Sequence, residues 1–307
     1  MLQALEGLST IWLVIAAGWL LAHVRVFDDP ARRILARTAF NVAMPALLVQ
    51  MMSHADLGRV FSRPLAVSVL AIALAIVAYV LVATLVLRRP LGHQVIGALS
   101  SSYTNVANIG LPIATYVLGD ATWVAPILLV QVGILQPAAL MILDARRHTG
   151  RVPIKRYLVM PFRNPITVAV AVGVLLRVTN LQLPDVLGSA VDSVGKMAVP
   201  LMLLAVGVSL RVDPMPGKGS PAAELWVVQG IKLLLQPVGA YALATWVFHL
   251  DAHSVLAVTV LASLPAATVV HIIATRYRSA EQLARDSVLW STILCVPVVI
   301  AVSGLLR

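Results

Sequence analysis

The sequence predicts an all-α integral membrane protein with ten transmembrane helices, arranged as two inverted five-helix repeats, and with breaks in helices four and nine. Hydrophobic residues make up 60% of the 307 residues and charged residues 12%, whereas a soluble domain has about 25% charged residues. The mean hydropathy is +0.91. Apolar runs reach the length of about 20 residues that crosses a bilayer as a helix. The surplus of apolar residues therefore predicts a chain with lipid as its solvent.

Charges, glycines and prolines bound the apolar runs. A basic segment, residues 144–164, separates a first repeat of residues 1–143 from a second of residues 165–307. An odd number of helices per half makes the second half insert upside down, which is the parity of an inverted repeat. The strict polar and apolar alternation of a membrane barrel is absent from the sequence. The expected helices are 5–24, 34–52, 64–87, 93–118, 121–143, 165–180, 186–210, 223–248, 253–275 and 285–306.

The distribution of lysine and arginine predicts the orientation. With both termini outside, 17 of the 23 lie in inner connections or at inner helix ends, and four lie outside. This asymmetry predicts a multi-pass protein of the cytoplasmic (inner) membrane, because positive residues stay on the cytoplasmic side. The net charge of +10 is thus a matter of topology, and nucleic acid is not an expected partner. The single cysteine, Cys295, excludes a disulfide framework and a thiolate metal cluster.

The fourth expected helix carries many hydrogen-bonding side chains between Ser100 and Pro112. Polar groups in hydrocarbon are costly unless satisfied, so this stretch is expected to face protein or a water-filled cavity. Gly110 and Pro112 weaken the helix and leave backbone groups free beside Asn105 and Asn108. Such a break offers carbonyls to a cation and a half-helix N-terminus to an anion. The alternative is a proline kink whose Ser and Thr side chains bond within the helix.

The ninth expected helix repeats the break at Pro265. Pro112 and Pro265 are 153 residues apart, and Pro45 and Pro200 are 155 apart, which supports a pairing of the two halves. Broken helices in corresponding positions point to a transporter's midplane site. His271, six residues after Pro265, is either a titratable group beside that cavity or a capped or interfacial histidine.

Helices two and seven contribute further polar candidates. By the repeat offset, Asn41 aligns with Lys196. Asp192 and Lys196 are four residues apart on one helix face and can pair. An intramembrane lysine is a functional candidate; a structural ion pair or a side chain snorkelling to the interface is the alternative.

Lys232 and Gln131 complete the candidate residues. Lys232, three residues before Gln236-Pro237, can attract an anionic substrate, or it lies near the inner membrane face. Gln131 is either a cavity liner or part of a satisfied helix–helix contact. Among the 13 acidic residues, only Asp192 falls clearly inside an expected helix, so the coupling ion, H⁺ or Na⁺, is left open. Metal-site, phosphate-loop and nucleophile motifs are missing, so neither enzymatic activity nor a metal or cofactor is expected.

The motifs together resemble the auxin efflux carrier family, in its bacterial, malonate- and malate-permease-like form. The resemblance implies two inverted five-helix repeats whose helices four and nine cross at prolines, here Pro112 and Pro265. It also implies a pocket at the crossing, in which Asn105 matches the asparagine of helix four. Asn108 stands where an apolar or aromatic residue is usual, and Lys196 where a small one is. The segments that carry the resemblance are Phe40–Leu48, Asn105–Pro112, Asn164–Pro165, Pro200–Gly207, Lys232 with Pro237, and Ser263–Pro265.

The expected function is secondary-active or facilitative transport of small organic anions by alternating access. Plant members of the resembled family export indole-3-acetate, and bacterial members include malonate and malate permeases. A bile-acid-type sodium symporter is the alternative; an intramembrane enzyme or a receptor is a distant one. Substrate identity, direction of flux and oligomeric state are left open, a homodimer being one option. The expected substrate-binding residues are Asn105, Asn108, Asn41, Lys196 and Gln131, with Asp192, Lys232 and His271 in support.

Overall fold

The computed structural model of the chain describes residues 2–54, 63–147, 159, 162, 164–212 and 222–306. Their regular structure is helical apart from one isolated β-bridge, which confirms the all-α class. Of the expected linker, residues 148–158 lie outside the described residues. Four apolar helices are shorter than a span: Leu13–His23, Val106–Leu118, Pro165–Thr179 and Ala252–Ala262. Six are long and apolar enough to cross a membrane: Asp29–His54, Arg63–Val86, Ala121–Ala145, Asp185–Val212, Ala222–Val247 and Glu281–Leu305.

The chain forms two compact units, and each takes segments from both halves of the sequence. The repeats expected from the sequence are defined by symmetry rather than by compactness, so the division at residues 144–164 stays a prediction. Unit 1 consists of Met1–Phe61, Ala107–Gly133 and Val159–Pro214, and unit 2 of Ser62–Val106, Ile134–Leu158 and Met215–Arg307.

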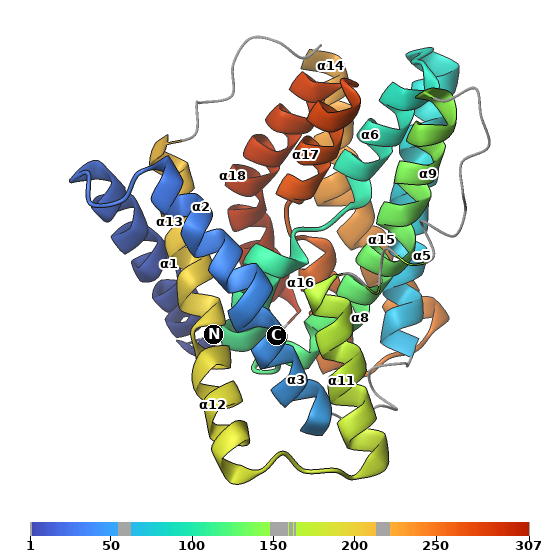
Figure 1. Cartoon of the computed structure of the whole chain (residues 1–307). Helices are drawn as coiled ribbons and strands as arrows, with labels where there is room; N and C mark the ends of the chain where they lie inside the picture. Colours follow the sequence, from blue (N-terminus) through green and yellow to red (C-terminus); the bar gives the residue numbers. More distant parts are fainter. Residues whose placement is uncertain are drawn as a thin grey trace. The chain divides into compact units, whose positions relative to one another are not determined.

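Within unit 1, α1 packs along α13 and α3 packs against both α11 and α12 (Figure 1). Glycines permit the closest approach: a Cβ at Gly207 would lie 2.1 Å from the carbonyl oxygen of Ile15, and one at Gly195 would lie 3.0 Å from the backbone of Leu47. The helices are α1 (Leu2–His23), α2 (Asp29–Thr38), α3 (Met44–His54), α7 (Leu111–Ile113), α8 (Val124–Val130), α11 (Pro165–Thr179), α12 (Asp185–Lys196) and α13 (Ala198–Val212).

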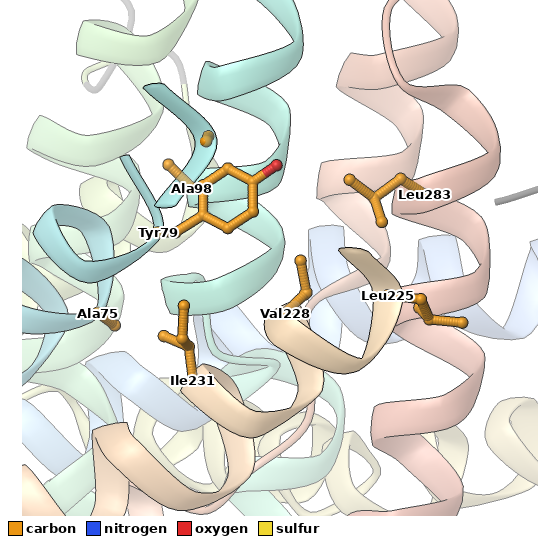
Figure 2. Close-up of a cluster of buried hydrophobic side chains, with 8 residues drawn as sticks. Ala75, Tyr79, Ala98, Leu225, Val228, Ile231 and Leu283 are labelled. Carbon is orange, nitrogen blue, oxygen red and sulfur yellow. The ribbon is translucent and has the colours of Figure 1, made fainter. Parts of the chain in front are cut away.

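Within unit 2, α6 packs against α5 and α18, and α15 packs against α5 and α16. A buried cluster of apolar side chains joins α5, α6, α14 and α18 (Figure 2). The helices are α5 (Arg63–Leu81), α6 (Leu91–Ser102), α9 (Gln136–Arg147), α14 (Ala222–Gly230), α15 (Gln236–Ala242), α16 (Ala252–Ala262), α17 (Thr268–Tyr277) and α18 (Glu281–Leu305).

Prolines widen several helices without ending them. A proline has no N–H and its ring crowds the carbonyl four residues back, so the preceding turn shifts to π-helical hydrogen bonding. Four π-helical turns end two residues before a proline. They are Ala39–Ala43 before Pro45, Val106–Gly110 before Pro112, Gln131–Leu135 before Pro137, and Ile231–Leu235 before Pro237.

The break in the fourth expected helix lies at Tyr103–Asn105, not at the predicted Gly110 and Pro112. Tyr103 is extended, with φ −78° and ψ 106°, and helical structure resumes at Val106. The widened turn before Pro112 accommodates that proline, so the helix continues through it. Three serines before the break, Ser100 to Ser102, each donate a hydroxyl hydrogen bond to the carbonyl four residues back, which is the alternative stated for this stretch.

The ninth expected helix is interrupted around Pro265. Regular structure stops after Ala262 and resumes at Thr268, and Pro265 lies between the two half-helices α16 and α17. Half-helices of this length leave backbone groups to be satisfied elsewhere in the unit.

Candidate functional site

The two helix breaks of unit 2 pair with each other. The amide of Asn105 donates to the carbonyl of Pro265 at 2.7 Å, and the amide of Ala267 donates to the carbonyl of Tyr103 at 3.0 Å. Thr104 and Ala266 thereby form an antiparallel β-bridge. Two extended segments thus satisfy part of each other's backbone, as irregular structure at membrane depth requires.

Lys232 lies at this pairing and is fully buried, with 0% of its surface exposed. Its Nζ donates to Gln236 Oε1 at 2.6 Å, to the carbonyl of Ala262 at 3.2 Å and to Thr104 Oγ1 at 3.3 Å. All three N–H donors are therefore used by neutral oxygens, two of them from the break segments or their ends. In the part of the chain that the structure describes, no carboxylate lies within ion-pair distance of Lys232.

Glutamines extend the polar contacts around the breaks. The Gln236 side-chain amide donates to the carbonyl of Ser102 at 3.3 Å, and the Tyr103 hydroxyl donates to Gln136 Oε1 at 3.4 Å. Asn105 itself is 5% exposed. The breaks therefore carry a polar lining drawn from four helical segments of one unit.

The electrostatics of this place favour a negative charge. Helix α17 begins directly after the break, and its N-cap, Ala267, supplies no side-chain hydrogen bond. A helix N-terminus carries a partial positive charge and free amide donors. When the amine of Lys232 is protonated, it adds a full positive charge, and the two together attract an anion and disfavour a second cation.

The candidates on helices two and seven lie in unit 1. The Asn41 amide donates to the carbonyl of Arg37, four residues back, at 2.9 Å. Lys196 pairs with Asp192 at 2.5 Å, and the exposed fractions of these side chains are 74% and 37%. Both contacts stay within one helix, the arrangement expected of the structural alternative. Lys196 ends α12, and a turn at Met197 separates it from α13.

Four further candidates of unit 1 lie on the helix after the first break and on the next one. Asn108 and Gly110 are in the π-helical turn, and Pro112 is buried in α7. Gln131 is 1% exposed, and its Nε2 has no hydrogen-bond partner among the described residues. A buried amide without a partner is costly, so Gln131 remains a candidate for binding a polar group of a substrate.

His271 lies on α17 in unit 2, one turn after the break. Its Nδ1 is buried and has no hydrogen-bond partner within the described ranges. The structure therefore brings Asn105, Pro265, Lys232 and His271 into one unit, and places Asn41, Asn108, Gln131 and Lys196 in the other.

Buried acidic residues were missed by the sequence analysis. Glu224 is 0% exposed, Asp286 2% and Asp144 8%, so Asp192 is not the only acid inside the helices. All three lie near helix ends, where the apolar runs stop and local hydropathy predicts exposure. Their partners come from distant segments: Tyr277, for example, donates to Asp144 Oδ1 at 2.5 Å across 133 positions of sequence.

The helices and the paired breaks define a class of protein. A chain with this many membrane-length apolar helices is a multi-pass membrane protein, and half-helices that meet at a buried polar place are typical of secondary transporters.

Comparison with known proteins also indicates a membrane transporter. The sequence profile of a family described as "Membrane transport protein" matches residues 4–302. The chain therefore belongs to this family, that of the auxin efflux carriers, and is a transporter rather than an enzyme. A protein of Rhizobium meliloti (strain 1021) named "Putative malonate transporter" is 26% identical over 315 residues, which cover 96% of this chain and 93% of that protein.

Proposed function

We propose that this protein carries small organic carboxylates, such as malonate or malate, across the cytoplasmic membrane by alternating access. The observation that carries the proposal is the buried ammonium of Lys232 at the paired helix breaks, surrounded by neutral oxygens. A desolvated cation without a counter-charge is costly, and a bound carboxylate would offset that cost. The name of the relative from Rhizobium meliloti supports the substrate class.

The roles of the site residues follow from their positions. Lys232 attracts the carboxylate, and Asn105 donates a hydrogen bond to it beside the N-terminus of α17. Pro265 keeps the ninth helix broken by removing an amide donor there. Within unit 1, Asn41, Asn108, Gln131 and Lys196 are further substrate-binding residues, and Asp192 supports Lys196. Within unit 2, His271 supports the break.

Two tryptophans support a position of this site near the middle of the bilayer. Trp226 and Trp246 are 53% and 70% exposed and lie at opposite ends of the continuous helix Ala222–Val247. Their separation of 20 positions corresponds to about 30 Å of helix, the thickness of the hydrocarbon core. Tryptophan is enriched at both membrane interfaces, so Gln236, halfway between them, and the nearby Lys232 fall close to the midplane.

The same proposal includes ten membrane crossings in two inverted repeats, with both termini outside. The six long helices, the two broken ones, α1 and α11 supply the ten crossings, and the parity of five per half gives the inversion. The excess of lysine and arginine in the inner connections supports the orientation.

Uptake into proteoliposomes tests the function. Labelled malonate, malate and indole-3-acetate are offered to the purified full chain, with proton and sodium gradients imposed separately, for the wild type and Asn105→Ala. We expect saturable carboxylate uptake that the substitution weakens at least tenfold. Folded wild-type protein that moves none of the three acids would refute the proposal, and strict sodium dependence would favour the bile-acid-type symporter instead.

A further inference from the structure

A second buried polar site lies at the far end of the same helices. The carboxylate of Glu224, at the start of α14, receives three donors. The Tyr79 hydroxyl donates to Oε1 at 2.7 Å, and His93 Nε2 lies 2.8 Å from the same oxygen. The Arg89 guanidinium donates to Oε2 at 2.6 Å. The contacts span 131 to 145 positions of sequence, so the site exists only in the folded protein.

The packing around the site is built to hold it. Tyr79 is fully buried, and its ring lies among the apolar side chains of Ala98, Val228 and their neighbours (Figure 2). The ring occupies the space that a side chain at position 97 would need: a Cβ on Gly97 would come within 2.0 Å of the tyrosine hydroxyl. The glycine thus admits the ring that directs a hydroxyl group to Glu224.

His93 and Arg89 are the partly exposed members of the site. Their side chains are 19% and 29% exposed, whereas that of Glu224 is 0% exposed. A carboxylate accepts hydrogen bonds, so Nε2 of His93 carries the hydrogen and Nδ1 is left to bind a second one. Imidazole is the side chain that changes charge between about pH 5 and 8.

Within the described parts of the chain, no neighbouring charge is left over to neutralise a proton that binds His93. Arg89 and Glu224 neutralise each other, so a proton on His93 adds one positive charge to the site. Several other charged or titratable groups on the helices packed against α6 have partners of their own, whereas Nδ1 of His271 on α17 has none among the described residues. Asp286 on α18 pairs with Arg285, Asp144 on α9 binds Tyr277 on α17, and Lys232 bonds at the helix breaks.

Two helical segments connect this site to the breaks. Helix α6 runs from His93 to Ser102, and α14 with the following turn runs from Glu224 to Lys232. The nine positions from His93 to Ser102 correspond to about 14 Å of helix. A unit charge at that distance changes the affinity for a monoanion about sevenfold at an effective dielectric constant of about 20.

The geometry points to His93, held by Glu224, as a proton-binding site that couples proton uptake to carboxylate binding at the helix breaks. This inference rests on the proposed carboxylate transport and deepens it. The proton binds Nδ1, and the imidazolium stays hydrogen-bonded to Glu224 through Nε2. Its positive charge raises the affinity of the breaks for an anion, and by reciprocity the bound anion holds the proton. Proton binding and anion binding therefore favour each other.

The experiment measures malonate exchange into proteoliposomes with the same pH on both sides, so that the orientation of the protein does not matter. Wild type, His93→Gln and His249→Gln are compared between about pH 5 and 8. Glutamine keeps a donor for Glu224 but binds no proton, and His249 is exposed in a loop after the continuous helix Ala222–Val247. We expect the KM of wild type and His249→Gln to fall towards acidic pH at least about sevenfold more than that of His93→Gln, because any protonation of malonate itself affects all three proteins alike. If the KM of His93→Gln depends on pH in the same way as that of wild type, the inference is overturned.

A measurement without substrate separates this site from the transport proposal. Histidine-labelled protein in lipid nanodiscs is titrated by NMR, and the His93 resonance is assigned by its loss in His93→Gln. We expect that resonance to shift between about pH 5 and 8 as the imidazole binds its proton. A His93 resonance that does not titrate there refutes the proton site even if malonate is transported. A titrating His93 in a protein that moves no carboxylate leaves the proton site standing and refutes the transport proposal alone.

Discussion

Replacement of Lys232 by methionine removes the buried positive charge and keeps a side chain of similar length. All three donors of the ammonium are used by Gln236, Thr104 and Ala262, so a bound carboxylate sits beyond this shell, about 6 to 10 Å from Nζ. At an effective dielectric constant of about 20, the lost attraction is about 1.7 to 2.8 kcal/mol per negative charge. The KM for a monocarboxylate therefore rises about 15- to 100-fold.

The assay is the concentration dependence of uptake for malonate and for indole-3-acetate, in wild type, Lys232→Met and Lys196→Met. Malonate carries two negative charges, so Lys232→Met is expected to weaken it more than the monoanion. The effect at Lys196 is expected to be smaller, because that ammonium is 74% exposed and already paired with Asp192. An unchanged elution profile shows that Lys232→Met is folded. If the folded variant has an unaltered KM for both acids, the electrostatic reasoning is refuted.

Three further predictions concern stability and the breaks. Gly97→Ala forces a Cβ against the buried tyrosine ring of α5 and is expected to destabilise the fold by about 1 to 3 kcal/mol. Gly230→Ala, whose Cβ would have no atom within 4 Å, is expected to stabilise the fold by about 0.5 kcal/mol. Thermal unfolding in detergent compares the two variants, and equal melting temperatures contradict the packing argument. Pro265→Ala restores an amide at the break and is expected to reduce malonate uptake more than Pro112→Ala, which lies within continuous helical structure; the reverse order contradicts the position of the break. Asp251 caps α16 by accepting hydrogen bonds from the hydroxyl and the amide of the serine three residues on, and these bonds lower the pKa of the Asp251 carboxyl. The cap therefore stabilises the protein at a pH above the ordinary carboxyl pKa. This stabilisation is lost as the pH falls through the lowered pKa of the folded state. The melting temperatures of wild type and Asp251→Ala should therefore differ at neutral pH and converge in acid, and a constant difference argues against the cap.

Most of the helices could be located from hydropathy alone. The expected helix 64–87 corresponds to Arg63–Val86, and 223–248 to Ala222–Val247, because a membrane span needs a continuous apolar run and ends where charges begin. Both signals, the apolar run and the charges that end it, lie within the helix itself or next to it, so one sequence is enough to locate the helices.

The break in the fourth helix could not be located in this way. Pro112 is the strongest local signal for a break, yet the π-helical turn before it absorbs the proline. The chain instead breaks at Tyr103–Asn105, where the backbone finds partners in the segment around Pro265. Those partners lie some 160 positions away, and no local pattern names them.

The ranking of the two intramembrane lysines also depended on long-range contacts. Lys196 and Lys232 both lie within apolar runs of the sequence. In the structure, the first is an exposed member of a pair within one helix, and the second is fully buried among oxygens from three segments. Burial decides which charge is costly and therefore which one gains most from an anion.

Composition and the spacing of apolar runs are sufficient to define a helical membrane protein, its expected orientation and the prolines that disturb its helices, because insertion into lipid depends on the hydropathy of each segment by itself. The three buried carboxylates, the partners of Lys232 and the site around Glu224 and His93 follow from the tertiary structure. Each joins side chains more than 100 positions apart or lies at a helix end where the sequence indicates exposure. Hydrogen bonds and charges act across space, and only the packed helices decide which of them meet.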